Sequence, residues 1–239
     1  MAIAAISGHT GSITFAAGHV VQCYEWTLAP TVGMFETTGH SPASGYKTNA
    51  AGIPSWGGSY RCHEVPTAAT TVAGFTYSSF VSAWEVRLSC DALPTTKFTD
   101  AWVTNIAGLY SASGSIDVWL EDTAAPPLAG VTEAGCVFTV GAGRTYTTDL
   151  ITGDALDIGI SADGSRRNVR IPWVGTGACV AVGTVPDIAD TGAATFSIDG
   201  TKQYAGTILS TGVTASFNAD RTTGEFTVDF VGTGALTPT

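Results

Sequence analysis

The chain has 239 residues, of which 44% are hydrophobic and only 13% are charged, about half the charged fraction of an ordinary soluble domain. Glycine and proline, with 29 and 10 residues, stay below the share that marks a disordered chain. The net charge of −10 argues against a protein that grips phosphates, because nucleic-acid binders cluster Lys and Arg. The composition therefore predicts a folded chain of one large or two small domains.

No secretory signal or membrane segment is predicted. Residues 1–8 lack a basic start and a long apolar stretch, and no apolar run approaches the roughly 18 residues of a membrane helix. The five cysteines have no C-x-x-C spacing, which indicates reduced, mostly buried thiols. The adjacent pair Cys62-His63 is more typical of a strand than of a metal site, so no metal is expected. No cofactor is expected either, because Gly175-Thr176-Gly177 lacks the third glycine and the following helix of a dinucleotide loop.

Short alternating segments dominate the chain. Ile116, Val118 and Leu120 follow a period of two, which recurs at residues 169–173 and 226–230, as expected of half-buried strands. The only candidates for a short helix lie at residues 99–105 and 186–191. The pattern predicts an all-β fold, in which antiparallel strands form β-sandwich or barrel-like units.

Turn signals separate these segments at hairpin spacing. They are Asp163-Gly164, Asp199-Gly200 and Thr223-Gly224.

The first half of the chain repeats itself. Trp26-Thr27-Leu28 and Thr37-Thr38 recur 58 positions later as Trp84-Glu85-Val86 and Thr95-Thr96, and Gly58-Ser59 recurs 56 positions later as Gly114-Ser115. Several matches that share one offset predict an internal duplication.

The second half repeats separately. Residues 138–146 match residues 196–204 at an offset of 58, and residues 174–178 match residues 231–235 at an offset of 57. The chain therefore divides into blocks A (8–65), A′ (66–122), B (135–183) and B′ (193–239). We expect two related units in one chain, with A and A′ in residues 1–125 and B and B′ in residues 126–239; alternatively, the two pairs intermix to form the two units.

In the A block, a Gly-rich strand precedes a Trp-x-Leu strand, a Thr-Thr segment, a polar loop and an Ala-Gly-Ile-Pro-Ser-Trp-Gly-Gly-Ser-Tyr strand at residues 51–60. In the order of these segments, the block resembles the major tail protein, or tail tube protein, family of long-tailed bacteriophages. The B′ block resembles the C-terminal half of the family in Tyr204-Ala205-Gly206, Ser210-Thr211 and the ending at residues 230–236. The residues that carry this signature, with their repeat counterparts, are Trp26, Leu28, Thr37, Thr38, Gly52, Trp56, Gly58, Trp84, Thr95, Thr96, Gly108, Gly114, Gly232 and Gly234.

The resemblance implies a virion structural protein. Family members form stacked rings around the channel through which genomic DNA passes, so the implied partners are copies of this chain and other virion proteins. DNA would only pass through, without specific binding, and the implied location is the virion, assembled in the host cytoplasm. The family usually has one A and one B half, so a doubled chain could build a ring from three copies instead of six; the sequence leaves both the trimer and the hexamer open.

The polar loop at residues 39–49 is long for a hairpin, and long loops in compact domains are often functional. We expect this loop to be an arm between subunits, with Gly39, His40, Tyr46, Lys47 and Asn49 as its candidate contact residues.

Two other functions stay open. A capsid decoration or cement protein could use the same β units on the phage head, and a carbohydrate-binding β-sandwich module would need an exposed aromatic row such as Trp102, Tyr110 and Trp119. Catalysis is not expected, because the four histidines are scattered and no nucleophile motif is present. The basic cluster Arg166, Arg167 and Arg170 and the acidic pairs Asp154/Asp157 and Asp187/Asp190 are interpreted as surface residues.

Overall fold

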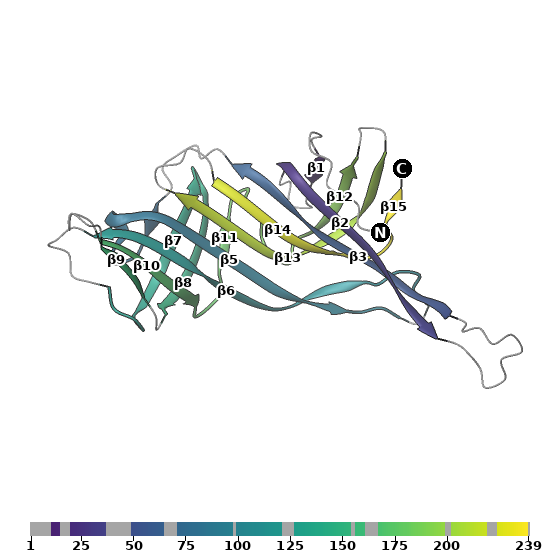
Figure 1. Ribbon diagram of the computed structural model, residues 1–239, viewed down its shortest axis with the longest axis horizontal. Helices are drawn as coiled ribbons and strands as arrows, with labels where there is room; N and C mark the ends of the chain where they lie inside the picture. Colours follow the sequence, from purple (N-terminus) through teal and green to yellow (C-terminus); the bar gives the residue numbers. More distant parts are fainter. Residues whose placement is uncertain are drawn as a thin grey trace, which may run out of the picture.

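The computed structural model describes residues 11–14, 20–36, 49–64, 71–97, 99–120, 127–153, 156–160, 167–198, 202–218 and 224–238. It confirms the all-β fold, since its strands form one antiparallel sheet (Figure 1). The strands are β1 (Gly11–Thr14), β2 (Val20–Glu36), β3 (Asn49–Glu64), β4 (Val72–Ala73), β5 (Val81–Pro94), β6 (Asn105–Leu120), β7 (Thr132–Gly141), β8 (Arg144–Thr152), β9 (Asp157–Ile160), β10 (Arg167–Gly175), β11 (Val180–Val182), β12 (Thr191–Ser197), β13 (Gln203–Asn218), β14 (Gly224–Gly232) and β15 (Thr237–Pro238).

Neither candidate helix forms. Residues 99–104 make turns before β6, residues 186–190 make a turn before β12, and the described helix content is the 3-10 turn η1 (Ser78–Phe80). Both segments lack an apolar face at helical spacing. The last residue of each segment begins a strand instead, because the apolar residues of this chain alternate with a period of two, which favours strands over helices.

Of the predicted turns, Asp163-Gly164, Asp199-Gly200 and Thr223 lie outside the described residues, and Gly224 is the first residue of β14.

Six strands of this chain form a closed barrel. The pairing order is β12-β1-β2-β3-β14-β13, and β13 pairs back with β12. We call these strands the first unit. It joins residues 11–64 to residues 191–232, so strands from block A pair with strands from block B′.

Six further strands pair in the equivalent order, but the first and last of them, β5 and β4, do not pair with each other. In the second unit, β5 pairs with β6, β6 with β10, β10 with β8, β8 with β7 and β7 with β4, so strands from block A′ pair with strands from block B. The units meet where β5 pairs with β13.

Equivalent pairs have the same register in both units. Leu28 pairs with Gly58 and Val86 pairs with Gly114, which is the same pair at the offsets of 58 and 56. Across the next strand, Gly58 pairs with Phe230 and Gly114 with Trp173.

Two irregularities in each hairpin also coincide at the offset of 58. The first falls between Cys23 and Glu25 in β2 and between Val81 and Ala83 in β5, and the second falls at Val32/Met34 and Cys90/Ala92. The duplication stays a prediction about the sequence, but the two hairpins share one pairing pattern down to their bulges.

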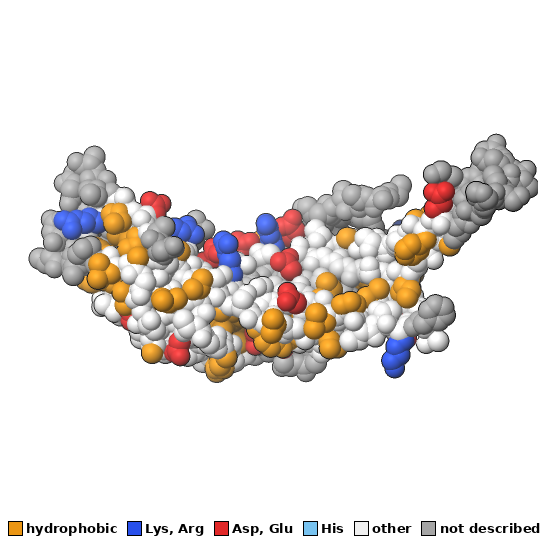
Figure 2. Space-filling model, turned by 90° about the horizontal axis from the view of Figure 1, so that it is seen from below, with side chains coloured by type: hydrophobic (Ala, Val, Ile, Leu, Met, Phe, Trp, Pro, Cys, Tyr) orange, Lys and Arg blue, Asp and Glu red, His pale blue; other side chains and the backbone are white. Residues whose placement is uncertain are grey.

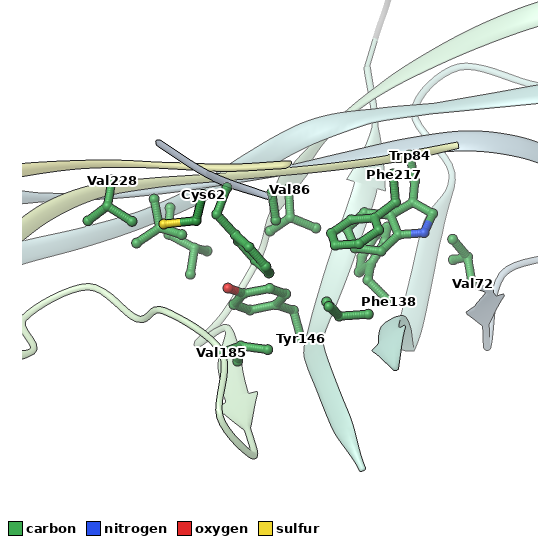
Figure 3. Packing of buried hydrophobic residues seen from close by; sticks show 14 of the residues in the cluster. Cys62, Val72, Trp84, Val86, Phe138, Tyr146, Val185, Phe217 and Val228 are labelled. Carbon is green, nitrogen blue, oxygen red and sulfur yellow. The ribbon is translucent and has the colours of Figure 1, made fainter. Parts of the chain in front are cut away.

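The core lies between two layers. Strands β2, β3, β14, β13, β5 and β6 form a long curved layer, with β7, β8, β11 and β12 behind it (Figure 1). Trp84 of β5 stacks on Phe217 of β13 with ring centroids 4.8 Å apart, and Phe138 of β7 faces Trp84 at 5.4 Å (Figure 3). Burial of such large aromatic rings dominates the stability of a small core.

The alternation predicted at three segments is confirmed. The residues at the alternating apolar positions are all buried in the core: Ile116, Val118, Leu120, Val169, Ile171, Trp173, Phe226, Val228 and Phe230. Trp56, Trp84 and Trp173 are also buried there, whereas Trp26 is half-buried and packs 5.4 Å from Phe196.

Candidate assembly surface

The face of the long layer that points away from the core carries many hydroxyl side chains, with charged residues and a few exposed apolar residues such as Ile53 and Trp119 among them. Because successive strand residues point to opposite faces, the positions between buried residues form this surface, which we call the polar face. Hydroxyl groups pair across neighbouring strands on it, with Thr31 and Ser55 oxygens 2.8 Å apart and their repeat counterparts, Ser89 and Ser111, 2.7 Å apart. Further hydroxyl side chains on it are Thr27, Ser59, Ser113, Thr214, Ser216 and Thr227.

The charges of the polar face are mixed and partnered. Arg61 lies 3.5 Å from the Glu25 carboxylate and 4.0 Å from that of Glu225, and Arg87 pairs with Glu85. Figure 2 shows acidic and basic side chains gathered together along one long edge of the molecule, midway along its length. These exposed pairs add little stability, but each guanidinium already has an acceptor.

The predicted basic cluster is split by strand alternation. Arg170 belongs to the polar face and donates to the Ser115 hydroxyl at 3.0 Å, Arg167 begins β10, and Arg166 lies outside the described residues. Burial raises the pKa of Asp117, which pairs with Arg170 across β6 and β10, although Arg170 lowers it.

One edge of β2 has no neighbour among the strands that the structure describes. β1 covers β2 only from Val20 to Cys23, and β3 occupies the opposite side. The corresponding stretch of β5, from Ala83 to Ser89, pairs with β13. An unpaired edge offers backbone N–H and C=O groups to another strand. Pro30 has no N–H and gives this edge one donor fewer than β5 has.

A second edge lies in β9. This strand pairs with β10 on one side, and no other described strand pairs with it. Its residues 157–160 correspond to residues 215–218 of β13 at the offset of 58, which is where β13 receives β5.

The end of the β5–β6 hairpin rests on the first unit. Val103 N–H donates to the Pro54 carbonyl at 3.0 Å, and Gly234 N–H donates to the Val103 carbonyl at 3.0 Å. The Asn105 side-chain amide donates to the Gly232 carbonyl at 2.9 Å. The hairpin of one unit is thus held by the neighbouring unit through backbone pairing.

None of the sequence motifs described above includes this contact. Thr48-Asn49 matches Thr104-Asn105 at the offset of 56, and Tyr46 matches Trp102. The offset of 56 that relates Gly58 to Gly114, followed back towards the N-terminus, therefore also relates the residues at this contact to residues 46–49.

Five of the six signature glycines occupy crowded positions; the exception is Gly234, where an added Cβ would meet nothing within 4 Å but the backbone has a positive φ of 101°. At Gly58, an added Cβ would collide with the Thr27 carbonyl, and at Gly114 it would collide with the Glu85 carbonyl, the repeat counterpart. Gly232 lies against the Trp56 indole, Gly52 against the Phe35 ring, and Gly108 against Asp91 and Leu93. These residues let neighbouring strands and rings approach closely, so their function is packing.

Other predicted positions are placed as follows. The Thr95 N–H donates to the Thr104 carbonyl at 2.8 Å, the Thr96 hydroxyl accepts from Thr104 N–H at 3.2 Å, and Asn49 begins β3 and is exposed. Thr37, Thr38, Gly39, His40, Tyr46 and Lys47 lie outside the described residues.

The proposed aromatic row for a sugar does not form. Tyr110 and Trp119 are exposed, but they stand nine positions apart on one strand, about 30 Å, and Trp102 is half-buried against the core. Adjacent stacking on one ligand is therefore impossible for Tyr110 and Trp119.

The thiols match the prediction from cysteine spacing. Cys23, Cys62, Cys90 and Cys136 are buried and Cys179 is half-buried, all as free thiols. Cys62 points into the core, whereas His63 stacks on Tyr24 on the exposed side at 4.0 Å. Within the described residues, no group of three His, Cys, Asp or Glu side chains could hold a metal ion.

No family model, curated relative or solved structure matches the chain. Among the described residues, no helix is long and apolar enough to cross a membrane.

Proposed function

We propose that this chain is a virion structural protein of a bacteriophage, which assembles with copies of itself into the stacked rings of a tail tube. Genomic DNA passes through the channel of that tube. The proposal combines the resemblance of the sequence to tail tube proteins with the surfaces of this fold.

The junction between the two units carries the proposal. Inside the chain, residues 83–89 of β5 pair with residues 212–218 of β13. The counterpart of this β5 segment, residues 25–31 of β2, is an open edge in the described structure, and β9 is the counterpart of the receiving strand. A second copy that pairs its β9 with β2 repeats the internal junction between chains.

Such a contact joins two different surfaces of the same protein. Heterologous contacts of this kind build rings when the rotation closes and filaments when it does not. Each chain supplies two similar units, so three chains supply six units to a ring.

The polar face suits the wall of a DNA channel. Its charges are of both signs and the arginines described above have protein acceptors, whereas phosphates are held by available basic side chains. Hydroxyl groups keep the surface hydrated without attracting the duplex strongly.

Negative-stain microscopy of the purified full-length chain tests the proposal. Rings or long hollow tubes are the expected result. Monomers or trimers that bind only to procapsids would overturn it in favour of a head decoration protein, and a monomer retained on a glycan column would overturn both.

A further inference from the structure

A groove in the second unit has no occupant among the described residues. It has a volume of about 590 Å³ and is lined by Leu88, Leu109, Tyr110, Gly177, Ala178 and Ile188, with Ser111, Ala112, Cys179 and Asp187 completing its walls. Leu109 is 82% exposed and Tyr110 is 61% exposed. These are large apolar surfaces for a soluble chain to leave uncovered.

The repeat offsets locate the matching place in the first unit. Tyr110 corresponds to Pro54 at the offset of 56, and Gly177 corresponds to Gly234 at the offset of 57. Pro54 and Gly234 are the residues whose backbone groups hold Val103. The position that is open in the second unit is therefore occupied in the first unit by the β5–β6 hairpin end.

The loop after β10, which lines the groove, makes the same backbone hydrogen bond as the loop after β14 in the first unit. Thr176 N–H donates to the Asp149 carbonyl at 3.0 Å, and Thr233 N–H donates to the Thr207 carbonyl at 2.9 Å. These two bonds coincide at the repeat offsets. Gly175 is the repeat counterpart of Gly232, whose carbonyl accepts a hydrogen bond from the Asn105 amide. The Gly175 carbonyl is therefore placed to accept a hydrogen bond from an asparagine amide in the same way.

We infer that this groove binds the end of the β2–β3 hairpin of a second copy of this chain, at residues 46–49. The inference rests on the proposed self-assembly and adds the docking site to it. By the equivalence of the units, Lys47 takes the place of Val103 between Tyr110 and Gly177, and Asn49 takes the place of Asn105 against Gly175.

Charge favours the same occupant. The groove contains the carboxylate of Asp187 and no Lys or Arg among its lining residues. The segment that would enter it carries Lys47 where the internally docked segment carries the neutral Val103. A cation near a carboxylate in a partly enclosed groove is favourable.

Within one chain, the described parts of β2 and β3 lead away from the groove. Figure 1 shows β2 and β3 running past the other strands and away from β7, β8 and β10 of the second unit. The occupant therefore comes from another copy, and each chain both offers a hairpin end and accepts one.

Cysteine cross-linking tests the contact. Hydrogen-bonded strands lie about 4.7–4.9 Å apart, with opposite Cα atoms up to about 5.5 Å apart, and a disulfide joins Cα atoms about 4.4–6.8 Å apart. The full-length variant Lys47→Cys/Gly177→Cys, with Cys179→Ser to remove the native thiol of the groove, should form covalent dimers and higher ladders on oxidation. Either single cysteine variant should not.

Mixing the two single variants provides the matched control. A Lys47→Cys chain and a Gly177→Cys chain should form only covalent dimers, because each carries one half of the contact. If rings or tubes form without these cross-links, the groove assignment is overturned and the proposed function stands. If the cross-links form without rings or tubes, the groove assignment stands and the proposed function fails.

A second pair of variants avoids engineered thiols. Leu109→Lys should weaken association at least tenfold, whereas Leu128→Lys, at an exposed leucine outside the groove, should leave it unchanged. Asn49→Ala should weaken association roughly tenfold, the usual scale of one lost hydrogen bond. Unchanged association for both Leu109→Lys and Asn49→Ala would overturn the inference.

Discussion

Gly114 of β6 lies against the indole of Trp173 in β10, and no methyl group fits between them. The same arrangement recurs at Gly58 and Phe230, where an added Cβ would come within 3.1 Å of the ring and would also meet a neighbouring carbonyl. The close approach of three strands at each glycine is therefore a packing requirement of both units.

Gly114→Ala and Gly58→Ala should each destabilise the protein by roughly 1–3 kcal/mol or more, the cost of overpacking a core. Urea unfolding followed by tryptophan fluorescence measures the change. Gly33→Ala is the control, because its Cβ would meet only the Phe35 ring at 3.8 Å. Equal stability of all three variants would contradict this explanation of the glycines.

Two buried tryptophans should respond differently to the same substitution. Trp56 Nε1 donates to the Gly234 carbonyl at 3.0 Å, whereas Trp84 Nε1 has no partner in the described structure. Trp56→Phe should therefore cost about 1 kcal/mol more than Trp84→Phe, the net value of one hydrogen bond. Thermal unfolding measures the loss of stability in each variant. A larger loss of stability for Trp84→Phe than for Trp56→Phe would refute the prediction.

Alkaline pH should destabilise the fold through its buried thiols. Burial raises the pKa of Cys136 to about 11 and that of Cys179 to about 12, from the model-compound value of 9.0. A raised folded-state pKa gives a contribution that is complete below pH 9 and is lost as pH rises through the folded value. The unfolding free energy should therefore decline from pH 9 towards pH 11–12.

Cys136→Ser removes one of these ionisations, so its stability should decline less steeply between pH 9 and 11. Val140→Ala, at a fully buried residue, should lower stability without changing the slope. Equal slopes for Cys136→Ser and the parent protein would show that this thiol does not titrate as described.

The predicted arm between subunits, residues 39–49, can be tested directly. Removing residues 39–48 should abolish rings and tubes while leaving the thermal unfolding midpoint nearly unchanged, because changes of loop length generally cost little stability. Asn105→Ala is the comparison, since it removes the internal hydrogen bond to Gly232 and should lower the unfolding midpoint. Tubes that persist after the deletion would contradict the role of the arm.

The proposed passage of DNA without retention predicts that the partnered arginines of the polar face do not hold duplex DNA. The parent protein should give no band shift with duplex DNA at about 0.15 M salt, because the arginines already have acceptors. Replacing Glu25, Glu85 and Glu225 by Gln should produce a shift that weakens steeply with added salt. DNA binding by the parent chain would refute the description of this face.

Much of the fold follows from the sequence. The apolar residues at 116–120 and 226–230 predicted strands and the face that each would bury, because a half-buried strand imposes a period of two. The repeat at Trp26/Trp84 and Gly58/Gly114 identified the positions that later pair in the same register, since equivalent strands need the same close contacts.

Only the tertiary structure decided which blocks pair. Strand partners depend on contacts between residues that are distant in the sequence. The alternation of apolar residues therefore could not show that the β2–β3 hairpin pairs with β14 and not with β5. The same holds for the docking of Val103 and for the exposed groove at Tyr110, where nothing local distinguishes a covered residue from an open one. The low charge and the repeats came from the sequence, whereas the open edges and the groove exist only once the strands are paired.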